Sequence, residues 1–280
     1  MQLGIRLHDS ENLPLEQRLA AVRAQGFTCA HIALAKLGNV PATNTSMTPG
    51  YATYLRRTFE TAGIDIAVLG CYLNLAHPDP VKLHELQQRY IAHMRFASLL
   101  GCSVVGTETG SPNAEYAFDI EASRTEEALE TFITNLKPVV KAAESFGVIV
   151  AIEPVYKHIV HSPERASRVL DEIESPNLQI IFDPVNLLHP DNLDRRDEIL
   201  GEAMDLLGDD IAIIHLKDYV LEDGEMKAVG CGFGEMKYDD IVKFAVEKKP
   251  YIQATLENTK PDTAERSRLF IKSIEDKYCM

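Results

Sequence analysis

Four residues of metal-binding type each stand at or near the end of a short apolar run in the second half of the chain. They are Glu153, Asp183, His215 and Glu257. Three carboxylates and one imidazole make an oxygen-rich donor set that suits one divalent cation. We expect Mn²⁺ first, with Mg²⁺, Co²⁺ or Zn²⁺ as the other candidates. Three carboxylates gathered without a cation would repel one another strongly, so the pattern predicts a metal site.

Other polar residues near the ends of apolar runs are weaker candidates, for contacts to a substrate. Lys217 comes two residues after His215, so on a strand the two side chains would point to the same face. There Lys217 would steady an oxyanion or a carboxylate of the substrate, or would form a salt bridge with a neighbouring acid. The remaining candidates for binding substrate hydroxyls, with capping or supporting roles as the alternative, are His8, Asn74 and Glu108.

Eight apolar, β-rich runs alternate with longer helix-like segments. The runs are continuous rather than alternating, which is typical of parallel strands buried on both faces. In this interpretation His8 ends the first strand and Glu108 ends the fourth. We expect strands at residues 3–8, 29–34, 64–70, 103–108, 148–153, 178–183, 211–216 and 251–257.

The segments between the runs carry helix signals. Thr48, Asp79 and Ser162 each precede a proline, which is the pattern of an N-cap followed by proline at the first helical position. Ser123 with a glutamate three residues later fits a capping box. Pro138 is expected to kink or split the helix that follows.

Eight strand–helix units in series predict a parallel sheet, and eight is the number that closes into a (β/α)8 TIM barrel. A doubly wound open sheet is the competing architecture, but its usual glycine-rich turn after the first strand is missing from the sequence. No linker or change in composition divides the chain, so we expect one domain over residues 1–280. The long non-helical stretches 35–47 and 219–236 follow predicted strands and would lie over the catalytic face as lids or substrate loops.

The composition excludes several classes of function. The chain has 42 acidic and 28 basic side chains, a net charge of −14, which argues against nucleic acid or an anionic membrane as a partner. No apolar stretch is long enough for a membrane span. Five cysteines without a CxxC pair are typical of reduced thiols in the cytoplasm. We expect a cytoplasmic protein that acts on a small molecule, and homo-oligomerisation stays open.

Four segments of the second half carry a family resemblance. AIEPVYKHIVHSPERA, IIFDPVNLLHPDN, IIHLKD and ATLENT resemble the sugar-phosphate isomerase/epimerase family of the xylose isomerase-like TIM-barrel superfamily. The most specific stretch is HLKD followed by the glycine-rich VGCGFGEMKYDDIV. In that family the metal ligands are Glu, Asp, His and Glu at these strand ends, so the resemblance assigns the same four residues that the strand ends indicate.

The resemblance also implies an activity. It predicts a divalent-metal-dependent isomerase or epimerase of a small sugar, ketose or inosose that works through a metal-stabilised enediolate. Glu153 and Glu257 would remove and return the proton. Loss of a β-hydroxyl from the same intermediate would instead make the protein a dehydratase, that is, a lyase. The sequence leaves open the substrate, its phosphorylation and the fate of the intermediate.

One departure from the family pattern concerns substrate contacts. Ketose 3-epimerases commonly have a histidine three residues beyond the strand-6 aspartate, where this chain has Asn186. Asn186 can still hydrogen-bond to a substrate but cannot titrate, and His189 is the nearby residue that would compensate. Two further alternatives are an endonuclease IV-like phosphodiesterase, which would need a histidine-rich rim and a basic face, and a non-catalytic sugar sensor, which would not need both glutamates.

Overall fold

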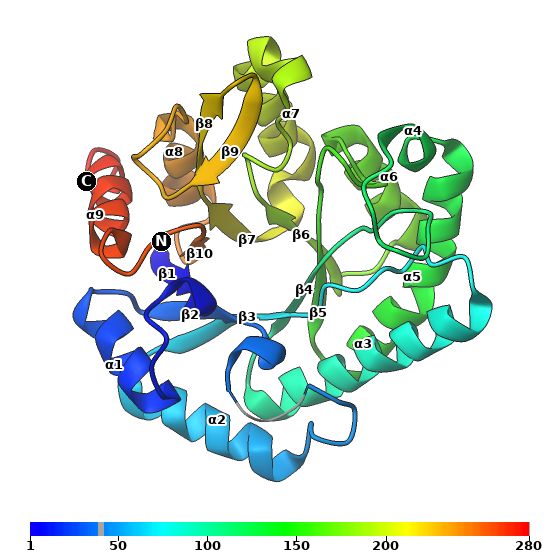
Figure 1. The fold of residues 1–280 in the computed structure, drawn as a ribbon, viewed down its shortest axis with the longest axis horizontal. Coiled ribbons are helices and arrows are strands. Elements are labelled where there is room, and N and C mark those ends of the chain that lie inside the picture. The colour runs from blue at the N-terminus through cyan, green and yellow to red at the C-terminus, as the bar shows by residue number, and fades with distance from the viewer. Residues whose placement is uncertain (39–41, 280) are drawn as a thin grey trace.

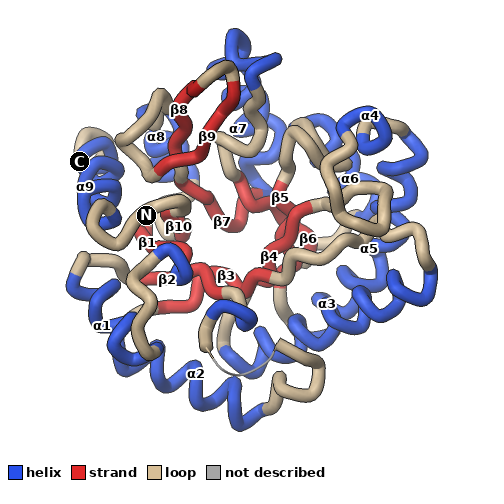
Figure 2. The backbone as a smooth tube through the Cα atoms, in the orientation of Figure 1, coloured by secondary structure: helices blue, strands red, loops and turns tan. Residues whose placement is uncertain are grey.

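The computed structural model describes residues 1–38 and 42–279, and eight parallel strands in it form a closed barrel (Figures 1 and 2). The order around the barrel is β1-β10-β7-β6-β5-β4-β3-β2, so the first strand closes the ring against the last. This confirms the predicted (β/α)8 TIM barrel. The barrel strands are β1 (Gln2–Arg6), β2 (Cys29–Ile32), β3 (Asp65–Gly70), β4 (Val104–Glu108), β5 (Ile149–Glu153), β6 (Leu178–Phe182), β7 (Ile211–Leu216) and β10 (Gln253–Leu256).

The helices lie outside the ring of strands (Figure 2). Thr48, Asp79 and Ser162 cap α2, α3 and α6 as predicted, each accepting hydrogen bonds from backbone N–H groups of the first turn. The helices are α1 (Leu15–Ala24), α2 (Pro49–Ala62), α3 (Pro80–Leu100), α4 (Ile120–Ser123), α5 (Glu126–Phe146), α6 (Pro163–Ile173), α7 (Arg196–Leu207), α8 (Asp239–Lys248) and α9 (Ala264–Glu275).

Three local expectations differ from the structure. Thr125, not Ser123, caps α5, because Ser123 already belongs to the short helix α4. Pro138 does not split α5, which continues through it. His8 does not end the first strand: β1 stops at Arg6, and the chain turns into a 3-10 helix at Leu7–Asp9, closed by a hydrogen bond from the Ser10 N–H to the Leu7 carbonyl.

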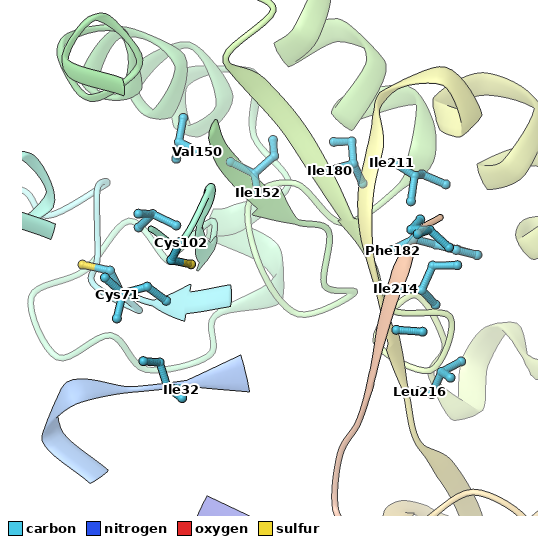
Figure 3. Packing of buried hydrophobic residues seen from close by; sticks show 14 of the residues in the cluster. Ile32, Cys71, Cys102, Val150, Ile152, Ile180, Phe182, Ile211, Ile214 and Leu216 are labelled. Atoms are coloured by element: carbon cyan, nitrogen blue, oxygen red, sulfur yellow. The ribbon is translucent and has the colours of Figure 1, made fainter. Parts of the chain in front are cut away.

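Side chains of the barrel strands alternate between two apolar layers. Those that point outward pack against the helices, and Figure 3 shows this packing for Val150, Ile152, Ile180 and Phe182. A separate cluster fills the barrel interior and contains Cys29, Ala67, Val68, Val104, Ala151, Ile181 and Ile213. Inward and outward side chains alternate along each strand. The next inward position after this interior cluster therefore lies at the carboxyl end of each strand.

The two long loops contain short elements. Residues 219–236 are not a plain loop, since β8 (Asp218–Glu222) and β9 (Glu225–Val229) form an antiparallel hairpin. The hairpin stands beyond the carboxyl end of β7, beside α7 and α8 (Figure 1). In the stretch 35–47, a 3-10 helix covers Leu34–Lys36, and residues 39–41 lie outside the described residues.

No helix within residues 1–38 and 42–279 combines the length and the apolar character needed to cross a membrane.

A buried histidine outside the barrel predicts how stability depends on pH. Burial in α3 lowers the pKa of His93 to about 4, although its ring nitrogen contacts the Arg89 carbonyl. As the pH falls, His93 therefore binds a proton near pH 6.5 in the unfolded chain but only near pH 4 in the folded chain. Stability from this group is present above pH 6.5 and is lost as the pH falls toward 4.

We predict that His93→Asn, which keeps a donor for the Arg89 carbonyl, removes this acid sensitivity. Between pH 7 and pH 5, the wild-type free energy of unfolding should fall by about 2 kcal/mol more than that of the variant. Urea titrations at the two pH values measure the difference. The same substitution at exposed His84, also on α3, is the control; equal pH dependence in wild type and His93→Asn would contradict the assignment.

Candidate active site

The four predicted ligands meet at the carboxyl end of the barrel. They belong to β5, β6, β7 and β10 or directly follow them, and their exposed fractions are between 0 and 4%. The Nδ1 atom of His215 lies 3.5 Å from Glu153 Oε2 and 3.4 Å from Glu257 Oε1. Ligand atoms of Glu153, Asp183 and His215 all lie within 4.8 Å of one another. Two carboxylates from strands far apart in sequence thus flank one imidazole.

Two cationic side chains offset the carboxylates. The Lys217 ammonium is 2.6 Å from Asp183 Oδ2 and 3.5 Å from Glu257 Oε2. Arg6, at the end of β1, places Nη1 3.0 Å from Glu257 Oε2 and also pairs with Asp9. Lys217 therefore shares the inner side with His215, as strand alternation predicted, and it forms the salt bridges that were the alternative to a substrate contact.

Two aromatic groups missed by the sequence analysis complete this side of the site. The His31 ring on β2 stacks on the His215 ring, with centroids 5.1 Å apart, and its Nδ1 is 3.6 Å from Glu257 Oε1. The Tyr72 hydroxyl lies 3.3 Å from His31 Nε2. A side chain at Gly70 would place its Cβ 2.8 Å from that nitrogen, so only glycine leaves room for the ring. The available signal was a histidine inside the otherwise apolar run CAHIAL.

The turn after β6 orients two of the ligands. Asp183 Oδ1 accepts hydrogen bonds from the backbone N–H groups of Val185 and Asn186, at 3.0 and 3.1 Å. This leaves Oδ2 on the side of Lys217. The Asn186 amide donates to Glu153 Oε1 at 2.6 Å, so Asn186 holds a predicted ligand in place.

The donor set fits a divalent cation. Both ring nitrogens of His215 and Nδ1 of His31 are buried and have no hydrogen-bond partner among the described residues. Buried polar atoms are normally paired. Burial would lower the pKa of His215, but without a cation the charges of Glu257 and Glu153 outweigh burial and raise this pKa to about 9. A bound cation would take the place of that proton and use the lone pair of the neutral imidazole. Two overlapping triads have ligand atoms close enough to bind one ion: Glu153 with Asp183 and His215, and His31 with His215 and Glu257.

The surrounding charges shift the pKa values of the three carboxylates in different directions. Burial would raise the pKa of Glu257, but His215, Lys217 and Arg6 together bring it well below its usual range. Burial also acts on Glu153, where His215 outweighs it and lowers the pKa. Burial prevails at Asp183 and raises its pKa to about 6 despite Lys217. The two carboxylates next to His215 are thus the ones whose pKa values are lowered.

The remaining predicted substrate contacts occupy different places. Glu108 ends β4 beside Tyr116 and His158, and burial with the nearby Glu153 charge raises its pKa to about 7. Asn74 is buried, and its amide donates to two backbone carbonyls of the loop after β4, those of Ser111 and Asn113.

His8 and His189 lie farther out than the ligands. His8 is exposed in the turn after β1. His189 caps the 3-10 helix that follows it, pairs with Asp191 and stacks on Tyr156 with centroids 4.5 Å apart. The structure therefore brings Glu108 and Asn186 to the rim next to Glu153, and it gives Asn74 and His189 partners in loops.

Asp218 fixes the loop that follows the hairpin. Its carboxylate is buried and accepts four backbone hydrogen bonds: Oδ1 from Tyr219 and Met236, each at 2.8 Å, and Oδ2 from Gly232 and Gly234, at 3.1 and 3.0 Å. A side chain at Gly234 would collide with the Tyr219 carbonyl. The glycine-rich stretch is therefore tied to the residue three positions after His215, and the hairpin projects from a fixed base.

Comparisons with known proteins agree with this architecture. A family model described as xylose isomerase-like TIM barrel matches residues 19–274. No curated protein sequence matches the chain. Similar solved structures include a D-tagatose 3-epimerase-like protein, with a TM-score of 0.75 at 18% identity over 99% of this chain and 98% of that one.

Two further structures have the same fold. The 3-keto-D-glucoside 4-epimerase YcjR from E. coli has a TM-score of 0.74 at 12% identity, over 98% of this chain and 99% of its own. The IOLI protein, solved with a bound zinc atom, has a TM-score of 0.72 at 19% identity, over 100% and 99% of the two chains. At these identities the likeness shows the fold, and the chemistry must be argued from the side chains described above.

We predict that Asp218→Asn destabilises the protein by about 2–3 kcal/mol, because an amide NH₂ group would face two backbone N–H donors in a buried place. Urea unfolding measures the loss, and hydrogen exchange should show faster exchange at Gly232 and Gly234. Exposed Asp223, at the tip of the hairpin, is the matched control for the same substitution. Stability equal to that of Asp223→Asn would refute the tethering role.

Proposed function

Because the chain belongs to the xylose isomerase-like TIM barrel family, we propose that it is a divalent-metal-dependent isomerase or epimerase of a small polyhydroxy carbonyl compound. One observation carries the proposal: two buried carboxylates, Glu153 and Glu257, flank one histidine at 3.5 and 3.4 Å. This arrangement brings two bases from different strands to the same imidazole nitrogen. Removal of a proton from one face of a carbon and its return from another need such a pair.

Glu153, Asp183, His215 and Glu257 would hold the cation, with Mn²⁺ as our first choice and Mg²⁺, Co²⁺ or Zn²⁺ as alternatives. When bound, a divalent cation supplies Lewis-acid stabilisation of the negative charge that develops on a carbonyl oxygen as the α-proton leaves. The unpartnered nitrogens of His215 support this assignment. The zinc in the IOLI structure is a property of that protein, and it agrees with metal binding by a protein of this fold.

The surrounding residues would set the roles of the two glutamates. The hydrogen bond from Asn186 fixes the Glu153 carboxylate, so its free oxygen faces the centre of the site. Arg6 and Lys217 favour the ionised form of Glu257. One glutamate takes the α-proton and the other returns a proton. The Lys217 ammonium, held between Asp183 and Glu257, would steady the developing oxyanion.

The destination of the returned proton decides the product. Return to the opposite face of the same carbon gives epimerisation, and return to the neighbouring carbon gives aldose–ketose isomerisation. Loss of a β-hydroxyl would make the protein a dehydratase, so product analysis separates that alternative. We also propose a cytoplasmic location, because all five cysteines are free and four of them are buried.

Proton exchange tests the proposal directly. The Mn²⁺-loaded protein is incubated in D₂O with a panel of ketoses, inososes and hydroxypyruvate, and deuterium is located by NMR or mass spectrometry. Incorporation at the carbon next to the carbonyl is expected for at least one compound, even where net conversion is small. Metal-loaded protein that exchanges no proton of any panel member would overturn the proposal.

We predict that Glu257→Gln reduces deuterium incorporation by about a hundredfold or more while the protein still binds Mn²⁺. The amide keeps an oxygen ligand but cannot accept the substrate proton. Exchange rates and calorimetric Mn²⁺ titrations are measured on the same preparation. Glu222→Gln, an exposed site on the hairpin, is the control. Exchange near the wild-type rate would exclude Glu257 as acid or base.

We predict that Asp183→Asn weakens Mn²⁺ binding by about a hundredfold or more. The substitution keeps an oxygen for the N–H groups of Val185 and Asn186, so the turn survives, but it removes an anionic ligand. Calorimetry gives the dissociation constants. Asp191→Asn, on an exposed aspartate of the following loop, should bind Mn²⁺ like the wild type; unchanged affinity in Asp183→Asn would contradict its role as a ligand.

A further inference from the structure

A second polar cluster lies on the rim beside Glu153. Glu108, the last residue of β4, is the register partner of Glu153 on the neighbouring strand, and paired strands are about 4.8 Å apart. The Tyr116 hydroxyl donates to Glu108 Oε2 at 3.3 Å, and His158 Nε2 lies 3.8 Å from the same oxygen. Three hydrogen-bonding groups thus gather one strand away from a proposed catalytic base.

The backbone holds this cluster in a fixed arrangement. Tyr116 has φ = 56°, a left-handed conformation that is uncommon for a bulky residue and costs of order 1 kcal/mol or more. The loop that carries His158 is tied to the loop after β4, because Val160 N–H donates to Thr109 Oγ1 at 3.0 Å and Ile159 N–H to the Gly110 carbonyl at 3.2 Å. Strain at a residue that faces a catalytic rim favours a functional interpretation.

The cluster has hydrogen-bonding capacity left over. His158 is only 2% exposed, yet its Nδ1 has no hydrogen-bond partner among the described residues. Both contacts to Glu108 use Oε2, and its side chain is 31% exposed, so Oε1 is available to a ligand. A carboxylate oxygen and an imidazole nitrogen can accept hydrogen bonds from hydroxyl groups.

The nearby cations are already engaged. Lys217 and Arg6 pair with the site carboxylates. Lys157 Nζ lies 5.5 Å from the centre of the Phe118 ring, and the Arg124 guanidinium lies over Tyr156. An anionic group that entered the cluster would meet the charges of Glu108 and Glu153, while these four cations already contact other groups.

We propose that Glu108, Tyr116 and His158 form a distal subsite that binds hydroxyl groups, and that it selects a substrate whose far end is neutral rather than phosphorylated or carboxylated. The inference rests on the proposed function for the location of the reacting end. It specifies the substrate class as a neutral polyhydroxy carbonyl compound, with the carbonyl at the four predicted ligands and a hydroxyl at Glu108.

Matched ligand pairs test the selectivity. Calorimetric titrations of the Mg²⁺-loaded protein at pH 8 compare D-fructose with D-fructose 6-phosphate and D-xylulose with D-xylulose 5-phosphate. The neutral member should bind about tenfold more tightly in at least one pair. Tighter binding of the phosphates, or no binding of either member of both pairs, overturns the subsite. If Lys157→Gln abolishes phosphate binding, that lysine is the anion site and the proposal fails.

Single substitutions locate the effect. Glu108→Gln should weaken binding of the neutral ketose by about threefold to tenfold. It should also reduce the ratio between the affinities for the neutral ketose and for its phosphate. Tyr116→Phe keeps the ring and should weaken binding by about threefold. Glu115→Gln is the matched control, because this exposed residue lies on the same loop and carries the same charge. If Glu108→Gln and Glu115→Gln behave alike, the cluster is not the subsite.

Ketose binding tests the subsite and proton exchange tests the proposed function, so the two proposals can fail separately. A protein that binds neutral ketoses through Glu108 but exchanges no proton in D₂O keeps the subsite and loses the proposed function. A protein that exchanges protons of phosphorylated ketoses only keeps the proposed function and loses the subsite.

Discussion

The mutual repulsion of three buried carboxylates governs this end of the barrel. Glu153, Asp183 and Glu257 are each less than 5% exposed, and an uncompensated buried charge costs several kcal/mol. The protein offsets them with Lys217 and Arg6. An anionic site of this kind needs cationic side chains, a bound metal ion, or both. The strands around the site place Lys217 and Arg6 next to the carboxylates.

Closure of the barrel brings a cationic side chain next to Glu257. Arg6 is separated from Glu257 by 251 residues, yet β1 and β10 are paired, and the two side chains meet where the ring closes. His31 reaches the same carboxylate from β2. An open sheet would leave β1 and β10 at opposite edges. The electrostatics of the site and the topology of the fold therefore depend on each other.

The strands, and the four polar residues proposed as ligands at their ends, could be located from the sequence because both have local signatures. Glu153 and Asp183 each follow a continuous apolar run, and the run fixes both the strand and its polar end. The same logic could not find Arg6, His31 or Tyr72, because their role appears only when the first strands meet the last. The prediction that His8 ends the first strand was wrong because the apolar pattern continues past the true end of the strand. The 3-10 helix after β1 ends the strand at Arg6, two residues earlier.

The hairpin was missed because its strands are short and largely exposed, so β8 and β9 lack the apolar runs that marked the barrel strands. Capping was predicted where proline followed the cap, as at Thr48, and was wrong at Ser123, where two candidate caps stand two residues apart. Local signals of this kind locate an element well when a single residue carries them. They fail where neighbouring residues compete for one role.

Four consecutive residues at the end of β7 connect the site with its surroundings. His215 points inward between two glutamates, Leu216 packs outward in the core, Lys217 points inward to Asp183, and Asp218 ties down the glycine-rich loop. Strand alternation explains the first three, and the buried carboxylate of Asp218 explains why the chain leaves the barrel in one defined direction. A displacement of this strand by one residue would exchange the inward and outward sets. Ligand geometry, charge compensation and loop position are thus set by one register.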